Sequence, residues 1–267
     1  MRVEKFESLQ NVFLLTDYVC GADYPSLARR LCSPKSGLGA DGLIAVQNAR
    51  DLPKMFFFNA DGSRAFTCGN GLRCVACLSV FRGQKSRRFF IQTEDGAKEV
   101  SVKSKKPFVA KVLLGKSEFF AGQVKTDAPI LSKIQVDGKN VFLFKTKLGV
   151  PHAVLIDQNE LLDFAPKISA HKFFSDGTNV DFVTVKSPSE IYVKTFERGV
   201  GWTLSCGTGG GASVAVCFAT KRCLGRVKVE YDGGTASVSV EEDGVFATAQ
   251  ANKVFCGEFD LVGGGDY

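Results

Sequence analysis

Short runs of apolar and β-branched residues recur along the whole chain, and Gly, Asp-Gly or Pro separates one run from the next. Such runs are typical of strands that end at turns. They predict eleven strands, at 42–46, 55–59, 89–93, 109–114, 141–146, 153–157, 180–185, 191–196, 227–231, 236–240 and 246–252. Apolar residues at helical spacing predict four helices, at 25–31, 71–82, 160–168 and 209–221. The pattern therefore predicts an α+β protein with mostly antiparallel strands.

One sequence pattern occurs twice, at a separation of 138 residues from Cys68 to Cys206. A Phe lies ten residues before each Cys, a hydroxyl residue comes just before it, and Gly-x-Gly follows. Each copy lies between a strand-like run and an amphipathic helix. Because the separation is close to half of the 267 residues, we predict two pseudo-symmetric domains, at 1–116 and 117–256. Residues 257–267 form a segment that could return to the first domain.

Composition narrows the class of protein. Apolar residues make up 45% of the chain and charged residues 23%, which is ordinary for a globular protein and excludes disorder, collagen and coiled coil. No apolar run approaches the roughly 18 residues of a membrane span, and the N-terminus carries acidic residues in place of a signal-peptide core. We therefore expect a cytoplasmic protein.

The net charge of +6 does not indicate a nucleic-acid partner, because Lys and Arg lie in small groups without aromatic residues placed for base stacking. Nine cysteines without a secretory signal are expected to be thiols. Cys74 and Cys77 have zinc-like spacing, but no second pair follows and only His152 and His171 could complete the ligands. We expect both to be small core residues of a helix, and we predict no metal.

Cys68 and Cys206 carry the candidate chemistry. Each precedes a glycine-rich start of a predicted helix, where unpaired N–H groups and the positive end of the helix dipole favour a thiolate. The same N–H groups form an anion site that can hold a carboxylate. Two such thiols on opposite sides of one carbon atom can invert its configuration, one as base and the other as acid. Helix-end hydrogen bonds would stabilise the enolate-like charge, so this chemistry requires no cofactor.

At these residues the chain resembles the diaminopimelate epimerase family of cofactor-independent, two-cysteine epimerases and racemases, over nearly its whole length. The matching motifs are Gly37-Leu-Gly-Ala-Asp-Gly42, Asn59-Ala-Asp-Gly-Ser63, Cys68-Gly-Asn-Gly-Leu-Arg-Cys-Val-Ala76, Gly149-Val-Pro-His152, Gly177-Thr-Asn-Val180, Glu197-Arg-Gly199 and Cys206-Gly-Thr-Gly209. The resemblance implies two domains, each a curved sheet around a central helix, with the active site in the cleft between them. It also implies the interconversion of LL- and meso-2,6-diaminopimelate, in lysine and peptidoglycan precursor biosynthesis.

The resemblance also assigns roles to residues. Cys68 and Cys206 match the acid/base pair, and His152 and Glu197 match groups that tune the two thiols. Residues that match the binding of the reacting α-carboxylate are Gly69, Asn70, Gly207 and Thr208. Residues that match the binding of the rest of the substrate are Asn11, Asn59, Asn179, Glu197 and Arg198, with Arg198 suited to a bidentate grip on the distal carboxylate.

Several positions depart from the family pattern. Val150 replaces the usual Asn before Pro-His, Trp202 replaces a usual Glu, and the N-terminal motif is Ser8-Leu-Gln-Asn-Val-Phe13 without its two glycines. The first hypothesis is an epimerase that keeps diaminopimelate as its substrate. The alternative is that Val150 and Trp202 reshape the pocket, which would give a racemase of another amino acid such as histidine, glutamate or lysine.

Two other classes of protein are weighed against the enzyme. A redox or metal protein would use the same cysteines, and a non-catalytic anion-binding module would use the glycine-rich loops but leave the duplicated Cys without a role. The expected partner is a small amino acid, with no nucleic acid and no membrane. The oligomeric state is left open, with a homodimer as one alternative.

Overall fold

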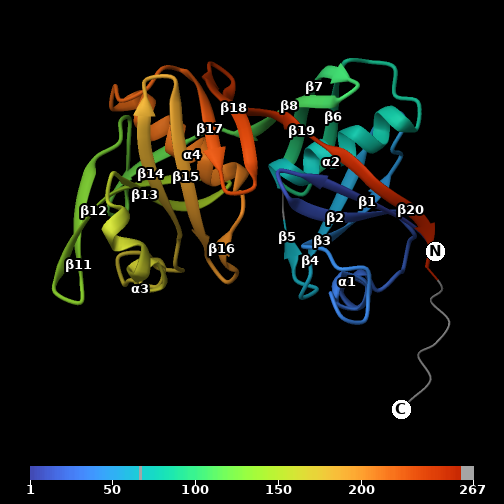
Figure 1. Cartoon of the computed structure of the whole chain (residues 1–267), viewed down its shortest axis with the longest axis horizontal. Helices are drawn as coiled ribbons and strands as arrows, with labels where there is room; N and C mark the ends of the chain where they lie inside the picture. The colour runs from blue at the N-terminus through green and yellow to red at the C-terminus, as the bar shows by residue number, and fades with distance from the viewer. Residues whose placement is uncertain (66–67, 260–267) are drawn as a thin grey trace, which may run out of the picture. The chain divides into compact units, whose positions relative to one another are not determined.

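The structure, a computed structural model, describes residues 1–65 and 68–259. Within these residues the chain forms twenty strands, four α-helices and one 3₁₀ helix, η1 (Figure 1). The Cα positions divide it into two compact units. Unit 1 comprises Met1–Val112 and the described residues from Ala249 onward, and unit 2 comprises Leu113–Thr248.

Unit 1 contains two helices and most of its strands in the first 112 residues. Its elements are β1 (Arg2–Ser8), β2 (Asn11–Asp17), α1 (Tyr24–Cys32), β3 (Gly42–Gln47), β4 (Lys54–Asn59), β5 (Arg64–Ala65), α2 (Gly69–Phe81), β6 (Arg88–Thr93), β7 (Gly96–Lys105) and β20 (Asn252–Glu258). Strand β8 (Phe108–Gly115) begins in unit 1 and ends in unit 2.

Unit 2 contains the remaining elements. They are β9 (Glu118–Ala121), β10 (Val124–Thr126), β11 (Leu131–Val136), β12 (Lys139–Leu148), β13 (Val150–Ile156), η1 (Asn159–Phe164), α3 (Ala165–Ser169), β14 (Asn179–Ser187), β15 (Glu190–Glu197), β16 (Gly201–Thr203), α4 (Gly207–Ala219), β17 (Arg226–Tyr231), β18 (Gly234–Glu241) and β19 (Gly244–Gln250), of which the last ends just beyond the unit boundary.

The two units repeat one strand topology. In unit 1, β1 pairs antiparallel with β2, β2 parallel with β3, β3 antiparallel with β4, β4 antiparallel with β5 and β4 parallel with β6. In unit 2, the same relations join β12 to β13, β13 to β14, β14 to β15, β15 to β16 and β15 to β17. In each unit a short strand, β5 or β16, precedes a helix, α2 or α4. That helix begins just after the repeated cysteine. The predicted α+β class with two similar domains is therefore confirmed.

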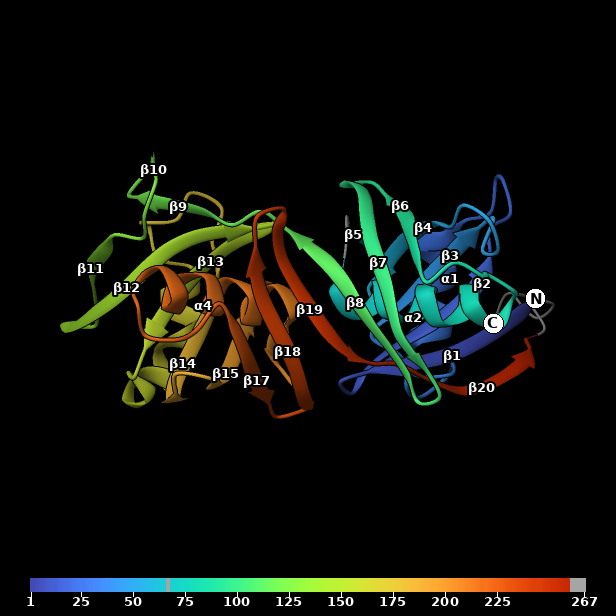
Figure 2. The ribbon, with the colours of Figure 1, turned by 90° about the horizontal axis from the view of Figure 1, so that it is seen from above.

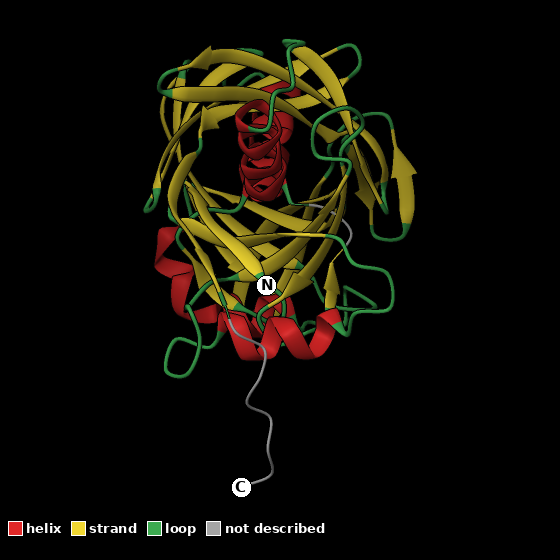
Figure 3. Ribbon diagram, turned by 90° about the vertical axis from the view of Figure 1, so that its right-hand side faces the viewer, coloured by secondary structure: helices red, strands yellow, loops and turns green. Residues whose placement is uncertain are grey.

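Each repeated helix lies at the centre of its unit. Residues 69–79 of α2 and 209–217 of α4 are buried along all faces, which is the burial expected of a helix enclosed by a sheet. Helix α2 contacts β1, β2, β7 and β20, and α4 contacts β12–β15 and β18. Figure 2 shows α4 with strands β12–β15 of its unit around it, and Figure 3 shows a helix enclosed by strands. The central position explains why both segments are apolar, because residues 69–79 and 209–217 are buried on every side of the helix.

All eleven predicted strands are present, whereas β1, β2, β5, β7, β9–β11, β16 and β20 escaped prediction because they are short or carry many polar residues. Two predicted helix starts are wrong by two residues. Helix α2 begins at Gly69 and α4 at Gly207, so the glycines after each cysteine belong to the first helical turn. The predicted helix at 160–168 is a 3₁₀ turn followed by a short α-helix that starts beside Pro166.

The predicted domain limits differ from the units. The first unit ends at Val112, inside β8, four residues before the expected limit at 116, because this strand continues unbroken through the boundary. The return to unit 1 begins at Ala249, earlier than the expected 257, because β20 pairs with β1 from Asn252 onward. Residues 260–267 of the expected return lie outside the described residues. No helix in the described part of the chain is long and apolar enough to cross a membrane.

Candidate active site

Cys206 is the N-cap residue of α4, with an extended backbone that turns into the helix at Gly207. Its Sγ accepts a hydrogen bond from the backbone N–H of Gly209 at 3.3 Å and lies 3.5 Å from Thr208 Oγ1. The sulfur therefore occupies the place of a capping oxygen and satisfies one of the N–H groups that a helix start leaves unpaired. This position agrees with the one predicted from the sequence.

The electrostatic expectation for Cys206 needs correction. The side chain is 6% exposed, and desolvation raises the pKa of the thiol well above its ordinary value, with the negative charges of Glu197 and Asp181 acting in the same direction. The hydrogen bonds of Thr208 and the Gly209 N–H lower this pKa but do not outweigh burial. Burial and the two carboxylates therefore favour the thiol form of Cys206, whereas the helix start by itself favours the thiolate.

Glu197 ends β15 and belongs to the same site as Cys206. Its Oε1 accepts a hydrogen bond from Thr203 Oγ1 at 2.8 Å. Burial raises the pKa of Glu197 above its ordinary value, although hydrogen bonds of Thr203 and Cys206 and the nearby His152 act against this rise. Of the two predicted thiol-tuning groups, Glu197 bonds to Cys206, and His152 lies near enough to Glu197 to act on its charge.

His152 is fully buried on β13, where its Nδ1 lies 2.7 Å from Asp181 Oδ2 of the neighbouring strand β14. The other carboxylate oxygen, Asp181 Oδ1, accepts a hydrogen bond from Thr195 Oγ1 at 2.8 Å. The Nε2 of His152 is buried and has no hydrogen-bond partner within the described residues. A buried polar atom left unpaired costs about 1–3 kcal/mol, so this ring position needs an explanation.

The remaining predicted residues of unit 2 lie at the strand and helix ends next to this network. Gly207 and Thr208 form the start of α4, whose N–H groups can bind an anion. Asn179 starts β14 and its Oδ1 accepts the backbone N–H of Arg198 at 2.9 Å. The guanidinium of Arg198 is exposed and donates to the carbonyl of Asp176.

Cys68 holds the equivalent place in unit 1. It is half-buried and is the N-cap residue of α2, with an extended backbone like that of Cys206. Gly69 and Asn70 begin the helix and are buried. The Asn70 Oδ1 accepts a hydrogen bond from the buried Arg73, whose Nε also donates to Ser8 Oγ at 2.9 Å. This arginine, which the sequence analysis passed over, ties the first turn of α2 to the end of β1.

Asn11 and Asn59 lie at one end of the unit 1 sheet. Asn11 begins β2, and Asn59 ends β4 opposite Gly42, the first residue of β3. Asp41 accepts hydrogen bonds from Asn11 Nδ2 at 3.2 Å and from the Val12 N–H at 2.7 Å. The Asn59 Nδ2 donates to Ser63 Oγ at 2.9 Å. Two asparagines predicted at distant positions therefore share one sheet end, and Asp41 orients the first.

The two departures from the family pattern occupy different environments. Trp202 pairs with Phe196 across β15 and β16, and its ring lies 5.5 Å from that of Phe196 and 5.8 Å from that of Phe182. Because side chains alternate along a strand, this places Trp202 on the face opposite to Glu197. Trp202 therefore lies away from Glu197, and its ring packs on Phe182 and Phe196 while it stays 42% exposed. Its effect on the pocket remains a prediction.

Val150, in contrast, begins β13 two residues before His152 and so shares its face. It follows Gly149, which has a positive φ of 73° and lies next to Thr208 at the start of α4. Of the two substitutions, Val150 is therefore the one that borders the Cys206 network.

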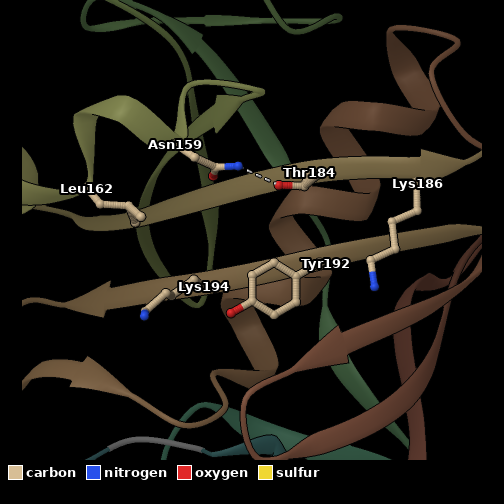
Figure 4. Close-up of a pocket in the computed structure, with 6 residues that line it drawn as sticks. All are labelled: Asn159, Leu162, Thr184, Lys186, Tyr192 and Lys194. Atoms are coloured by element: carbon tan, nitrogen blue, oxygen red, sulfur yellow. Dashed lines mark hydrogen bonds between the residues drawn. The ribbon is translucent and has the colours of Figure 1, made fainter.

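A hollow of about 300 Å³ lies elsewhere on unit 2, over β14 and β15. Figure 4 shows its lining residues, Asn159, Leu162, Thr184, Lys186, Tyr192 and Lys194. Both lysines face carboxylates, Lys186 in an ion pair with Glu230 and Lys194 at 3.7 Å from Asp232. The residues that line this hollow include no cysteine, histidine or carboxylate, so the two-thiol chemistry points to the cysteine sites instead.

The family model of diaminopimelate epimerase matches residues 5–120 and 144–254. A diaminopimelate epimerase of Caldanaerobacter subterraneus is 36% identical over 98% of this chain and 100% of its own length, and one of Desulfitobacterium hafniense is 35% identical over 96% and 97%. The chain belongs to the diaminopimelate epimerase family. The family resemblance drawn from the cysteine motifs is confirmed, and the chain is an isomerase.

Solved structures of low sequence identity share the two-domain fold of the diaminopimelate epimerase family. A hydroxyproline epimerase of Agrobacterium vitis superposes with a TM-score of 0.70 at 13% identity, over 99% of this chain and 94% of its own. A phenazine biosynthesis protein of the PhzF family from Bacillus anthracis superposes with a TM-score of 0.69 at 12% identity, over 98% and 99%.

Three orienting residues were not predicted as such: Asp181, which bonds to His152, Thr195, which bonds to Asp181, and Asp41, which bonds to Asn11. A signal for the first two was present. Asp181 lies two residues after Asn179 and Thr195 two residues before Glu197, so strand alternation puts each on the face of a predicted site residue.

Proposed function

We propose that this chain interconverts LL- and meso-2,6-diaminopimelate by a two-base mechanism in which Cys68 and Cys206 act on opposite faces of one α-carbon. The observation that carries the proposal is the duplication: two equivalent units each present one cysteine as the N-cap of an enclosed, glycine-started helix. Membership of the diaminopimelate epimerase family supports the substrate and the reaction.

In the forward step a thiolate removes the α-proton and the opposite thiol returns a proton to the other face. The raised pKa of Cys206 supports its role as the proton donor of the substrate-free enzyme, because that thiol keeps its proton. Cys68 then acts as the base, and the roles reverse in the back reaction. No cofactor takes part in this scheme.

The charge that develops on the substrate needs an anion site. The N–H groups at the first turns of α2 and α4, at Gly69, Asn70, Gly207 and Thr208, are suited to hold the α-carboxylate and to stabilise the enolate-like intermediate. We assign the remainder of the substrate to Asn11, Asn59, Asn179, Glu197 and Arg198. Arg198 would exchange its bond to the Asp176 carbonyl for the distal carboxylate.

The test is turnover in D₂O under reducing conditions, with LL-diaminopimelate beside L-histidine, L-glutamate and L-lysine, followed by chiral separation and mass spectrometry. We expect inversion of diaminopimelate alone, with one deuterium at the inverted carbon. Inversion of another amino acid would instead support a racemase whose pocket Val150 has altered. No exchange in any substrate would contradict the enzyme and favour a binding protein.

Cysteine variants test the two-base mechanism. Cys68→Ser and Cys206→Ser should each lower kcat at least about 10³-fold, because a hydroxyl is a far weaker acid and base than a thiol at neutral pH. The exposed Cys256 provides the matched control, and Cys256→Ser should keep full activity. Retention of more than a tenth of the activity by either active-site variant would contradict the mechanism.

We also propose that the only partner in the reaction is a small amino acid and that the protein is cytoplasmic. Light scattering after size-exclusion chromatography distinguishes a monomer from a homodimer.

A further inference from the structure

The network behind Cys206 contains an acid that the two-base mechanism does not use. Asp181 is fully buried, and both of its oxygens are engaged, Oδ2 with His152 Nδ1 at 2.7 Å and Oδ1 with Thr195 Oγ1 at 2.8 Å. A carboxylate in such a place can only accept hydrogen bonds, so the proton between Asp181 and His152 belongs to Nδ1. The second ring nitrogen, Nε2, is buried without a partner among the described residues.

We propose that Asp181 is a positioning residue of this active site, which holds His152 with its proton on Nδ1 and leaves Nε2 as the one ring atom available to the substrate or the thiol. The role of Asp181 in turnover rests on the proposed epimerase function. The tautomer of His152, however, can be measured without any substrate. This explains why Nε2 has no partner in the described residues: its hydrogen bond forms with the substrate or the thiol during the reaction.

The helix start supports this role, because it leaves room for the carboxylate. A Cβ at Gly209 would lie 2.4 Å from Asp181 Oδ1 and 2.6 Å from Thr195 Oγ1. The same glycine donates its N–H to Cys206 Sγ. One residue of α4 thus contacts both the acid and the sulfur, so the place of Asp181 and that of Cys206 are fixed together.

The charged and titratable groups around this point come from every strand that packs there. They are His152 from β13, Asp181 from β14, Glu197 from β15 and Tyr231 from β17, whose hydroxyl lies against Gly210; the first turn of α4 carries no acidic residue. Asp181 adds negative charge beside Cys206, so its removal changes both the histidine and the thiol.

The tautomer of His152 can be measured directly, because the chain has only two histidines. We expect ¹⁵N-histidine spectra of the substrate-free protein to show the proton on Nδ1 of His152. His171 is an internal reference of the opposite kind, because its Nδ1 accepts the Phe173 N–H at 3.1 Å and its proton must lie on Nε2. A His171→Gln variant assigns the two signals. A proton on Nε2 of neutral His152 in the wild-type protein would overturn the proposal.

Asp181→Asn tests the role in turnover, because the amide keeps the shape but can donate to Nδ1 and favour the opposite tautomer. We expect kcat to fall at least about 10-fold, because removal of the partner that orients a histidine costs this much or more, while KM changes less than about threefold. The Nδ1 proton signal of His152 should be lost in the same variant. Unchanged kcat together with an unchanged His152 spectrum would overturn the proposal.

Asp157→Asn is the matched control, because Asp157 is an exposed aspartate of the same unit at a positive φ of 53°, which Asn also adopts readily. It should leave kcat and the His152 spectrum unchanged. If Asp181→Asn does not fold, the wild-type spectrum alone still decides the tautomer. If the wild-type protein shows the predicted tautomer but turns over no substrate, the positioning stands and the proposed function fails.

Discussion

At the residue scale, the local environment of Cys206 reverses what its neighbours in the sequence suggest. A cysteine before a glycine-rich helix start is expected to be acidic, because N–H groups and the helix dipole favour the thiolate. Here one N–H does bond the sulfur, but the fully packed surroundings and two carboxylates from other strands favour the thiol. Burial and nearby charge therefore favour the protonated form of Cys206.

Removal of the negative charge of Glu197 should lower the pKa of Cys206, because that charge opposes the thiolate. In Glu197→Gln, alkylation of Cys206 by iodoacetamide should begin at lower pH than in the wild type, as quantified by peptide mass spectrometry. We expect kcat to fall about 10- to 100-fold, since the thiol no longer has its tuned proton affinity.

Glu190 is the control for this substitution, because it begins the same strand and its carboxylate bonds to Lys228 at 3.4 Å and to Glu230, away from Cys206. Glu190→Gln should leave the alkylation profile of Cys206 unmoved. If alkylation of Cys206 in Glu197→Gln begins at the same pH as in the wild type, or at a higher pH, then Glu197 does not act on the thiol through its charge.

At the element scale, the glycines of α4 are required by packing although they weaken an isolated helix. Ala is favoured over Gly inside a helix by about 1 kcal/mol. At Gly209, however, the added Cβ would lie within 2.6 Å of both Asp181 and Thr195, and at Gly210 it would overlap the Tyr231 hydroxyl. The helix start and the strands around it therefore fit only with glycine.

We predict that Gly209→Ala lowers the free energy of unfolding by about 1–3 kcal/mol, because the cost of overpacking exceeds the gain in helix propensity. Activity should fall as well, because Asp181 and Cys206 are displaced together. Denaturant unfolding and kcat measure the two effects. Gly225→Ala is the control, since its Cβ would meet only the Phe218 ring at 3.4 Å; equal behaviour of the two variants would contradict the packing argument.

At the scale of the whole molecule, the first and the last described strands pair with each other in unit 1. Strand β20 pairs with β1, and Glu4 of β1 lies against Lys253 Nζ of β20 at 2.5 Å and Arg82 Nη2 after α2 at 3.0 Å. The Glu4 side chain is only 3% exposed. One buried carboxylate thus joins three elements that are distant in the sequence.

This contact should make stability depend on pH. Burial raises the pKa of Glu4, but the hydrogen bonds and charges of Lys253 and Arg82 lower it more, so it lies below its ordinary value of 4.5. The stabilisation is therefore complete above about pH 4.5 and is lost as the pH falls through the folded-state value. Glu4→Gln should cost about 1–3 kcal/mol at pH 7, and its difference from the wild type should shrink toward pH 3.

Urea unfolding of both proteins between pH 7 and pH 3 provides the measurement. A difference that stays constant over this range would show that the charge of Glu4 contributes nothing. Glu118→Gln removes an exposed partner of Lys125 and should cost less than about 1 kcal/mol at every pH.

The sequence by itself determined the strand runs, the central helices and the repeated cysteine motif that led to the family. These features are local: apolar alternation, turn residues and a Cys-Gly-x-Gly start are all visible within a dozen residues. The motifs also predicted that four site residues lie at the ends of helices or strands. The structure places Cys68, Asn70, Glu197 and Cys206 at such ends.

Only the tertiary structure decided what surrounds those residues. It brought Asp181 to His152 across 29 residues and packed the ring of Trp202 on Phe182 and Phe196. It also returned β20 to β1 and buried Cys206 enough to keep its proton. The physical reason is that strand alternation predicts which side chains share a face, whereas which face is enclosed, and by which charges, depends on contacts between segments far apart in the chain.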